Sequence, residues 1–338
     1  MREDSLPMNT IPSLRGRSLL TLDDVSDAEM LDLLALADAL KKRRHQPPAR
    51  RRPLLAGKNI ALVFEKSSTR TRCAAIVAAA DEGAHAEYLS KNDIHFGRKE
   101  SIADSARVLG RMFHGILFRG FAHATVTGLA KHAGVPVWNG LTDDAHPTQI
   151  LADLQTMREQ FGTLQGLKAV FIGDGRNNVS NSFIQGCAKV GVHVTVCCPP
   201  ELAPSRTVLE AAAVDAQRNG SRIEVVTRPE DAVPGANVLY TDVWVSMGEE
   251  SQFAERLRLL RPYQVNLRLA QLTGNLDQGR LIFLHCLPAF HNRDTEVTRD
   301  LGALECTDDV FEAPFSKVFD QAENRMHTIK AMMVASLS

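Results

Sequence analysis

Apolar and polar positions alternate along the chain in blocks that suit short buried strands separated by amphipathic helices. In the first part of the chain, the apolar runs that predict strands are 60–64, 86–89, 116–118 and 135–138. The stretches between them with helical periodicity are 71–82, 101–112 and 123–132. Such alternation is typical of a parallel sheet whose strands are connected through helices.

The second part of the chain repeats this alternation. Its predicted strands are 169–172, 192–197, 223–226, 238–240 and 282–285, again with helices between them. Between the two parts, one helix is expected to join two domains, because these apolar residues share one helical face: Ile150, Leu151, Leu154, Met157 and Phe161.

These patterns predict an α/β protein with two doubly wound parallel-sheet domains and a cleft between them. The expected boundaries are 1–150 for the first domain and 151–320 for the second. The last helix, 321–338, is expected to pack back on the first domain through an apolar face formed by Met326, Ile329, Met332 and Met333. Ligands in such folds gather at the carboxyl ends of the strands and between domains.

Composition and charge exclude several classes of protein. The chain has 338 residues, 44% apolar and 23% charged, and a formal net charge of −1, so no global positive field would recruit nucleic acid. An uninterrupted apolar stretch of about 18 residues and an apolar leader are both missing, which argues against membrane insertion and secretion. The six cysteines lack C-x-x-C spacing, which favours reduced thiols in the cytoplasm over a zinc site.

One segment breaks the pattern of balanced charge. Residues 41–52 hold seven lysines and arginines and two prolines. The segment is open to interpretation as a nucleic-acid or membrane-surface patch, but the balanced charge of the whole chain favours a solvated loop between the first helix and the first strand.

The loop after the first predicted strand is rich in hydroxyl and guanidinium groups. After residues 60–64 the chain soon reads Ser67-Ser68-Thr69-Arg70-Thr71-Arg72, and an alanine-rich helical stretch follows. The free N–H groups and the dipole of a helix start favour an anion there, and guanidinium groups match phosphate oxygens. A plain helix cap needs only one hydroxyl, whereas this loop offers four hydroxyls and two arginines. We therefore expect a site for a doubly charged anion.

Two further strand ends of the first domain carry candidate chemistry. Arg119-Gly120 follows 116–118, and His146-Pro147-Thr148-Gln149 follows 135–138 and an expected turn at Asn139-Gly140. A single histidine or arginine is more often structural. Near an anion site, however, such residues can direct several donors at one carbonyl oxygen.

Three strand ends of the second domain carry amides, carboxylates and a thiol: 173–178, 241–248 and 285–288. The first has two glycines of a dinucleotide-binding fingerprint, but Asn178 stands where the third glycine is needed, which disfavours a dehydrogenase. The groups at these three ends suit a small amino-acid substrate whose ammonium groups need acceptors. A buried cysteine is usually a small apolar residue, but the strand-end position of Cys286 favours a polar contact with a substrate.

Taken together and in order, these motifs resemble the carbamoyltransferase family, and in particular its ornithine-specific members. The resemblance runs from about Leu19 to the C-terminus and rests on 68–72, 119–120, 146–149, Asp242 with 246–248, 285–288 and 324–326. The first three motifs are shared with aspartate-type relatives. Ser246-Met247-Gly248 and His285-Cys286-Leu287-Pro288 favour ornithine.

The resemblance implies transfer of the carbamoyl group of carbamoyl phosphate to the δ-amine of L-ornithine, giving L-citrulline and phosphate in arginine biosynthesis. It implies that carbamoyl phosphate contacts Ser68, Thr69, Arg70, Thr71, His95, Lys99, Arg119, His146, Gln149, the backbone carbonyl of Leu287, and Arg325. Ornithine would be held by Asn178, Asp242, Ser246, Met247 and Cys286. The catalytic roles would fall to Arg119, His146 and Cys286.

The resemblance also implies no cofactor and no metal, small molecules as partners with neither nucleic acid nor membrane, a cytoplasmic location, and a homotrimer or a multiple of it. The segment 95–99 would complete the site of an adjacent subunit. Here the chain departs from the family, because His95 stands where a glutamine is usual and Arg98 where a histidine is usual. We hypothesise that this change alters sensitivity to phosphate-like inhibitors or toxins.

Two alternatives remain open from the sequence. One is a carbamoyltransferase for another amine, such as putrescine or an N-acylornithine. The other is a non-catalytic binding protein on the same fold. The sequence does not decide whether flux runs toward citrulline or away from it.

Overall fold

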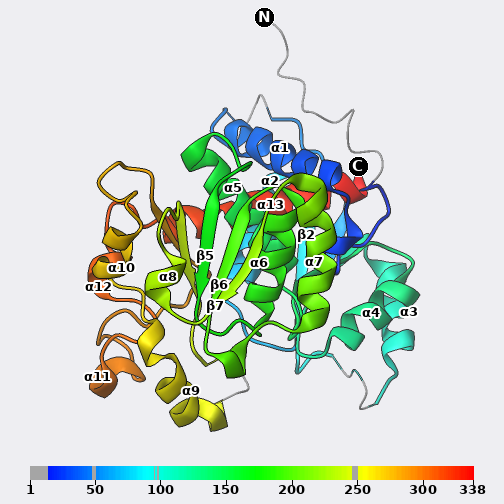
Figure 1. Ribbon diagram of the computed structural model, residues 1–338. Coiled ribbons are helices and arrows are strands. Elements are labelled where there is room, and N and C mark those ends of the chain that lie inside the picture. Colours follow the sequence, from blue (N-terminus) through cyan, green and yellow to red (C-terminus); the bar gives the residue numbers. More distant parts are fainter. Residues whose placement is uncertain (1–13, 48–50, 95, 97–98, 246–249) are drawn as a thin grey trace, which may run out of the picture. The chain divides into compact units, whose positions relative to one another are not determined.

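The computed structural model describes residues 14–47, 51–94, 96, 99–245 and 250–338. The chain forms two compact units, one made of Met1–Gln155 with Glu323–Ser338 and the other of Thr156–Ala322. Each unit is built on one parallel sheet flanked by helices (Figure 1). The predicted α/β architecture with two parallel sheets is therefore confirmed.

The first unit has a four-stranded sheet in the order β2-β1-β3-β4. Its strands are β1 (Asn59–Phe64), β2 (His85–Ser90), β3 (Gly115–Arg119) and β4 (Val137–Leu141). The helices that lie wholly within this unit are η3 (Leu22–Asp24), α1 (Asp27–Arg44), α2 (Arg70–Asp81), α3 (Ile102–Met112) and α4 (His123–Ala133). The chain runs outward from β1 to β2 and then returns to β3 on the other side of β1. The strand order thus reverses between β1 and β3, and ligands bind at such switch points in doubly wound sheets.

The two central strands form the middle of this unit's core. All residues of 60–64 and 116–118 are at most 1% exposed, as near-continuous apolar strands covered on both faces require. Helices α3 and α4 pack side by side (Figure 1). They come into close contact at Gly110, where a Cβ atom would lie 1.7 Å from the carbonyl oxygen of Ala133. Only glycine fits at this contact.

The second unit has a five-stranded sheet in the order β7-β6-β5-β8-β9. Its strands are β5 (Lys168–Ile172), β6 (His193–Cys197), β7 (Ile223–Val226), β8 (Val238–Thr241) and β9 (Ile282–His285). Its helices are α6 (Asn178–Lys189), η5 (Pro200–Leu202), α7 (Arg206–Asn219), α8 (Pro229–Ala232), η6 (Glu250–Gln252), α9 (Phe253–Leu260), η7 (Arg261–Tyr263), α10 (Leu267–Leu272), α11 (Thr298–Leu301) and α12 (Asp308–Phe311). The order reverses between β5 and β8, so this sheet has a switch point of the same kind.

Two further helices continue from one unit into the other along the chain, α5 (Pro147–Phe161) and α13 (Val318–Leu337). Residues 324–336 of α13 are all buried, which places this part of the helix in the core of the first unit. Ser336 accepts a hydrogen bond from the indole of Trp138, and Lys330 pairs with Asp81 at 2.6 Å. The predicted return of the C-terminal helix to the first unit is confirmed. Among the described residues, no helix combines the length and apolar character needed to span a bilayer.

The prediction for the fourth strand was wrong at its end. β4 runs through Asn139 and Gly140, which were expected to form a turn. The Asn139 backbone N–H donates to the Leu19 carbonyl at 2.9 Å, and its side-chain amide donates to the Leu20 carbonyl at 2.9 Å. The strand continues because a distant segment satisfies both the backbone and the buried amide.

The prediction of a solvated basic loop was also wrong for residues 41–44. These four cations form the last turn of α1, where the helix dipole favours positive charge. Arg43 pairs with Glu82 and Arg44 with Asp81, both at the end of α2. This part of the basic segment therefore holds two helices together, and residues 48–50 lie outside the described part of the chain.

Candidate active site

The candidate residues of the first unit lie at its switch point. Strands β1 and β3 are paired with Phe64 opposite Arg119, so the loop that leads into α2 and the residues after β3 start from the same edge of the sheet. Parallel strands deliver their carboxyl ends together, which brings the expected anion loop beside Arg119.

The start of α2 is only partly explained as an ordinary helix cap. Ser68 Oγ accepts the N–H of Thr71 at 3.2 Å, as a capping hydroxyl does. Thr69 stands at the cap position itself, but its side chain makes no capping hydrogen bond. Ser67 and Thr69 are exposed. The cap therefore uses one hydroxyl of the loop, which is all that a plain helix cap needs. The hydroxyl of Thr69 stays beside the helix N-terminus, where it can contact an anion.

Two buried guanidinium groups meet at one hydroxyl. Arg119 Nη1 donates to Thr71 Oγ1 at 3.3 Å, and Arg325 Nη2 donates to the same oxygen at 3.0 Å. Arg325 Nη2 also lies 3.2 Å from Thr148 Oγ1. Arg119 is 8% exposed and Arg325 3%. Two like charges held this close in a buried site create a positive potential that a dianion would relieve.

The orientation of Gln149 is fixed by two hydrogen bonds. Its Oε1 accepts from Arg325 Nη1 at 2.7 Å, and its Nε2 donates to Asp153 Oδ1 at 2.8 Å. These partners assign the amide oxygen to the side where the guanidinium group lies. An acceptor is thereby fixed at the cationic site, as recognition of an amide NH2 group would require.

His146 is a neutral donor or acceptor in this site. Burial lowers the pKa of its imidazole well below 6.5, and the positive charges of Arg325, Arg119 and Arg70 lower it further. The ring therefore carries no charge at neutral pH. A neutral imidazole beside guanidinium groups can donate a hydrogen bond to a developing oxyanion without adding a proton to the site.

Arg72 does not belong to this group, contrary to its place in the expected anion loop. Its guanidinium lies 3.7 Å from the centroid of the Tyr88 ring on β2. Arg70 and Arg72 are two positions apart on the helix, so their side chains leave it in different directions. Arg70, by contrast, is one of the positive charges that lower the pKa of His146.

The expected segment 95–99 is only partly described. His95 and Arg98 lie outside the described residues. Lys99 is described and exposed, in the turn that precedes α3.

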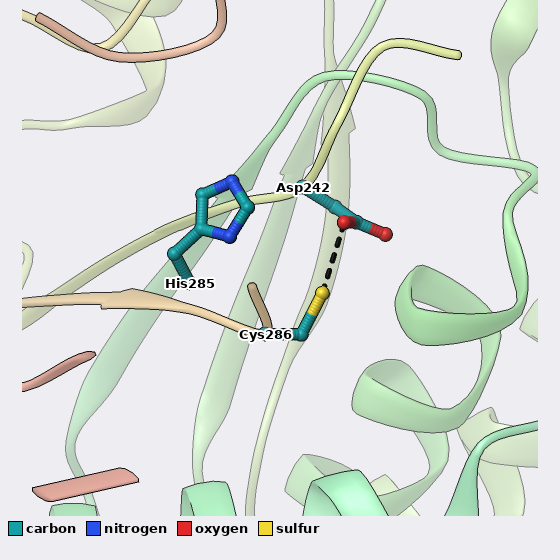
Figure 2. A group of neighbouring side chains, drawn as sticks. All are labelled: Asp242, His285 and Cys286. Carbon is teal, nitrogen blue, oxygen red and sulfur yellow. Dashed lines mark hydrogen bonds between the residues drawn. The ribbon is translucent and has the colours of Figure 1, made fainter. Parts of the chain in front are cut away.

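The candidate residues of the second unit gather at its own switch point. Asp242 follows β8, and Cys286 follows the neighbouring strand β9. The Cys286 thiol donates to Asp242 Oδ1 at 2.9 Å, and the His285 ring lies nearby (Figure 2). The thiol is thus in a polar contact with a carboxylate.

Asn177 is the amide that contacts this carboxylate directly. Its Nδ2 donates to Asp242 Oδ2 at 3.1 Å, while its Oδ1 accepts the N–H of Ser180 at 2.7 Å as the cap of α6. The sequence pointed instead to Asn178, the next residue, which is half-buried at the first position of α6. Ser246 and Met247 lie outside the described residues.

The carboxylate of Asp242 is surrounded by donors. Besides Asn177 and Cys286, the N–H of Val243 donates to Oδ1 at 2.7 Å. Burial nevertheless raises the pKa of Asp242, while the hydrogen bonds from Cys286 and Val243 oppose that rise. A buried carboxylate of this kind is a suitable partner for a substrate ammonium group, which would supply the missing positive charge.

His285 fixes the backbone that follows it. Its Nδ1 accepts the N–H of Leu287 at 2.9 Å, so its Nε2 carries the hydrogen and donates to Glu305 at 3.2 Å. Both side chains are fully buried. Leu287 has a φ of 59°, a conformation that is uncommon for a non-glycine residue and is stabilised here by the ring of His285.

Within the described part of the chain, two groups of residues have the geometry to ligate a metal. Asp242, His285 and Cys286 offer ligand atoms within 4.8 Å of one another, and so do His291, Asp308 and Glu312. In the first group both ring nitrogens of His285 and the thiol of Cys286 are engaged in hydrogen bonds, so a metal would have to displace them. The expectation of a metal-free site stays a prediction.

Several residues of the site were missed from the sequence. Thr148 and Asp153 orient Arg325 and Gln149, Glu305 orients His285, and Asn177 contacts Asp242. A signal was available for Asn177, because an asparagine just before an apolar helix is a preferred cap and its side chain is fixed there. Glu305 gave none, since it contacts His285 only through the fold.

Comparisons with known proteins agree with this geometry. The family model for the carbamoyl-P binding domain of aspartate/ornithine carbamoyltransferase matches residues 17–159, and the model for its Asp/Orn binding domain matches 165–336. A catabolic ornithine carbamoyltransferase of Bacillus licheniformis is 55% identical over 336 residues, covering 98% of this chain and 99% of the relative.

Other relatives give the same result. A catabolic ornithine carbamoyltransferase of Streptococcus gordonii is 53% identical and covers 96% of each chain. The solved structure of ornithine carbamoyltransferase from Pyrococcus furiosus superimposes with a TM-score of 0.86 at 41% identity, covering 96% of this chain and 98% of that one.

Proposed function

Because the chain belongs to the aspartate/ornithine carbamoyltransferase family and is therefore a carbamoyltransferase, we propose that L-ornithine is its acceptor. The products are L-citrulline and phosphate. The observation that carries the proposal is the pair of half-sites of opposite character, a cationic one at the switch point of the first unit and one built on a buried carboxylate and a thiol in the second.

Carbamoyl phosphate suits the cationic half-site. Its dianionic phosphate takes the N-terminus of α2 with Ser68, Thr69 and Arg70, close to the positive charge of Arg119. Thr71, Arg119 and His146 donate to the carbonyl oxygen, and the oxygen of Gln149 accepts from the carbamoyl NH2 group. Arg325 and the Leu287 carbonyl complete the set proposed for this ligand.

Ornithine suits the second half-site. Asp242 accepts from the α-ammonium group, and Asn178, Ser246 and Met247 bind the remainder of the amino-acid end. Cys286 lies beside the nucleophilic δ-amine. A diamine without an amino-acid end, such as putrescine, leaves these polar groups without partners, which is costly in a buried site.

The reaction needs no covalent enzyme intermediate. The neutral δ-amine attacks the carbonyl carbon and a C–N bond forms, while the charge on the carbonyl oxygen is stabilised by Arg119, His146 and Thr71. The bond from carbon to the phosphate oxygen then breaks, and the leaving phosphate takes the electron pair and the proton lost by the amine. Positioning and oxyanion stabilisation supply the rate enhancement.

The acceptor is tested by colorimetric measurement of carbamoyl transfer with ornithine, putrescine, N-acetylornithine and aspartate. We expect turnover with ornithine at least about 100-fold above the others, as selection by buried polar groups gives. Faster turnover of putrescine or N-acetylornithine than of ornithine would show instead that the enzyme is a carbamoyltransferase for another amine. The family assignment leaves the non-catalytic alternative without support.

We also propose a catabolic direction, which replaces the initial expectation of arginine biosynthesis. The proposal is supported by relatives of Bacillus licheniformis and Streptococcus gordonii that carry this designation. Phosphorolysis of citrulline, coupled to ATP formation by added carbamate kinase, is expected to proceed at millimolar phosphate. Reverse turnover that is negligible at such phosphate concentrations would contradict the catabolic assignment.

A cytoplasmic homotrimer, or a multiple of it, remains our proposal for the assembly. Its support is the segment 95–99, which in the family resemblance completes a neighbouring subunit's site. Light scattering of the purified chain is expected to give three times the mass of one chain, or a multiple of that. A monomer with full activity would refute the shared site.

A further inference from the structure

A buried ion pair lies next to the second half-site and has no role in the reaction described above. Asp174, in the turn after β5, pairs with Arg256 on α9. Their side chains are 6% and 4% exposed. Asp174 Oδ2 accepts from Arg256 Nη1, and Oδ1 accepts the backbone N–H of Arg176 at 2.9 Å. The carboxylate therefore joins a helix to the turn in which it lies.

That turn leads directly to the carboxylate of the half-site. The N–H of Asn177 donates to the carbonyl of Asp174 at 3.4 Å, and Asn177 Nδ2 donates to Asp242 Oδ2 at 3.1 Å. Asp242 in turn accepts from the thiol of Cys286. One continuous series of contacts thus runs from Arg256 through the turn to the two side chains proposed to bind ornithine.

The turn also has little room to move. A Cβ atom at Gly175 would lie 2.8 Å from the carbonyl oxygen of Leu202 and 2.9 Å from Cδ of Pro204. The backbone is therefore confined by its packing, and the ion pair sets the position of the residues on either side of the glycine. A small shift at Asp174 is transmitted to Asn177 because only two residues separate them.

Stability alone is a weak reason for this pair. Buried ion pairs are often no more stabilising than apolar residues of the same volume, because desolvation offsets the attraction. What an ion pair adds is geometry, since the planar guanidinium group fixes the direction of the carboxylate.

We propose that Arg256 is a positioning residue for the amino-acid acceptor, which it serves by holding Asp174 and thereby the Asn177 amide against Asp242. The inference rests on the proposed function, because it assigns the purpose of the Asp242 half-site to acceptor binding. It extends that function to a residue that does not itself touch the substrate.

The test compares steady-state constants of the full-length enzyme with those of Arg256→Met and Asp174→Asn. We expect the KM for ornithine to rise about 10- to 100-fold, as loss of a charged hydrogen bond predicts, with the KM for carbamoyl phosphate changed less than about 2-fold. The affinity for L-norvaline, which has the same amino-acid end without the δ-amine, is expected to fall by the same factor. Arg256→Lys is expected to restore part of the loss.

A second ion pair of the same unit, between the buried Lys189 and the half-buried Asp215, provides the control. Lys189 and Asp215 lie 3.3 Å apart, with side chains 7% and 14% exposed, and no contact described here joins them to Asp242. Lys189→Met is expected to lower Tm to an extent comparable with Arg256→Met and to leave the KM for ornithine unchanged.

The possible outcomes distinguish three cases: Arg256 positions the acceptor site, Arg256 only balances the charge of Asp174, or the proposed function is wrong. Unchanged KM for ornithine in Arg256→Met, or an equal rise in Lys189→Met, overturns the inference. If Arg256→Met does not fold, the double variant Asp174→Asn with Arg256→Gln removes both charges. A normal KM for ornithine in that variant overturns the inference, and a raised KM supports it. Wild-type enzyme that neither turns over ornithine nor binds L-norvaline refutes the proposed function itself.

Discussion

The two switch points of this molecule have the same topology and opposite chemistry. At the β1/β3 point, buried arginines share the hydroxyl of Thr71 and burial keeps His146 uncharged. At the β5/β8 point, donors surround the carboxylate of Asp242, and burial raises its pKa. Burial thus acts against charge on the titratable group in both places, but the fixed charges differ. The fold supplies two equivalent positions, and the residues at the strand ends make one suitable for an anion and the other suitable for an ammonium group.

The largest effect is expected from a substitution in the first half-site that leaves the second half-site unchanged. Arg119→Met removes a donor proposed for both the phosphate and the carbonyl oxygen, so we expect kcat/KM to fall at least about 10³-fold. L-norvaline is expected to bind once carbamoyl phosphate is supplied at saturating concentration. Steady-state kinetics and calorimetric titration measure the two effects. A fall in kcat/KM below about 10-fold would contradict the role given to Arg119.

A smaller effect is expected from the second half-site. Cys286→Ser keeps a donor to Asp242 but changes its size and acidity, so the KM for ornithine is expected to rise about 10-fold together with a lower kcat. Binding of carbamoyl phosphate is expected to stay the same. Cys73→Ser, at an exposed position on α2, serves as the control for loss of a thiol. Unchanged constants in Cys286→Ser would refute its assignment.

The smallest expected effect concerns stability and pH. Burial lowers the pKa of His327, on α13, from 6.5 to about 4, and it also lowers that of His146. The unfolded chain binds these protons as the pH falls below about 6.5, whereas the folded chain does not, so the free energy of unfolding decreases between pH 6.5 and 4. Each such group adds a slope of at most about 1.4 kcal/mol per pH unit.

Denaturant titrations at several pH values measure this slope. His327→Gln is expected to reduce it while leaving the pH dependence of carbamoyl phosphate binding unchanged, because His327 is not proposed to be in the site. An unaltered slope in His327→Gln would show that this histidine is not responsible. His146→Gln sharpens the comparison, because it is expected to reduce the slope and also to lower kcat.

Much of the fold and part of the site followed from local sequence. Strands β1 and β9 were predictable because their apolar runs end abruptly in polar motifs. The parallel topology brings the ends of neighbouring strands together. The direction of individual side chains was not predictable. Arg72, on α2, stacks on Tyr88 of β2, and this contact depends on the register of the sheet.

Long-range contacts explain the remaining differences. Asn139 was expected in a turn, but the segment of Leu19 pairs with it and extends β4. Glu305 contacts His285 from a loop 20 positions further along the chain, so no local sequence pattern predicts this contact. The contact of Asn177 with Asp242 also depends on the fold, because the two residues lie 65 positions apart in the chain.

The most direct test of the account is the binding of phosphonoacetamide, a stable dianionic analogue of carbamoyl phosphate, to wild type, Arg70→Met and Arg72→Met. Calorimetry is expected to show binding to wild type, at least about 10-fold weaker binding to Arg70→Met, and less than about 2-fold change for Arg72→Met, whose guanidinium stacks on Tyr88. Absence of binding to wild type, or equal affinities of all three proteins, would contradict the claim that the start of α2 binds the dianion.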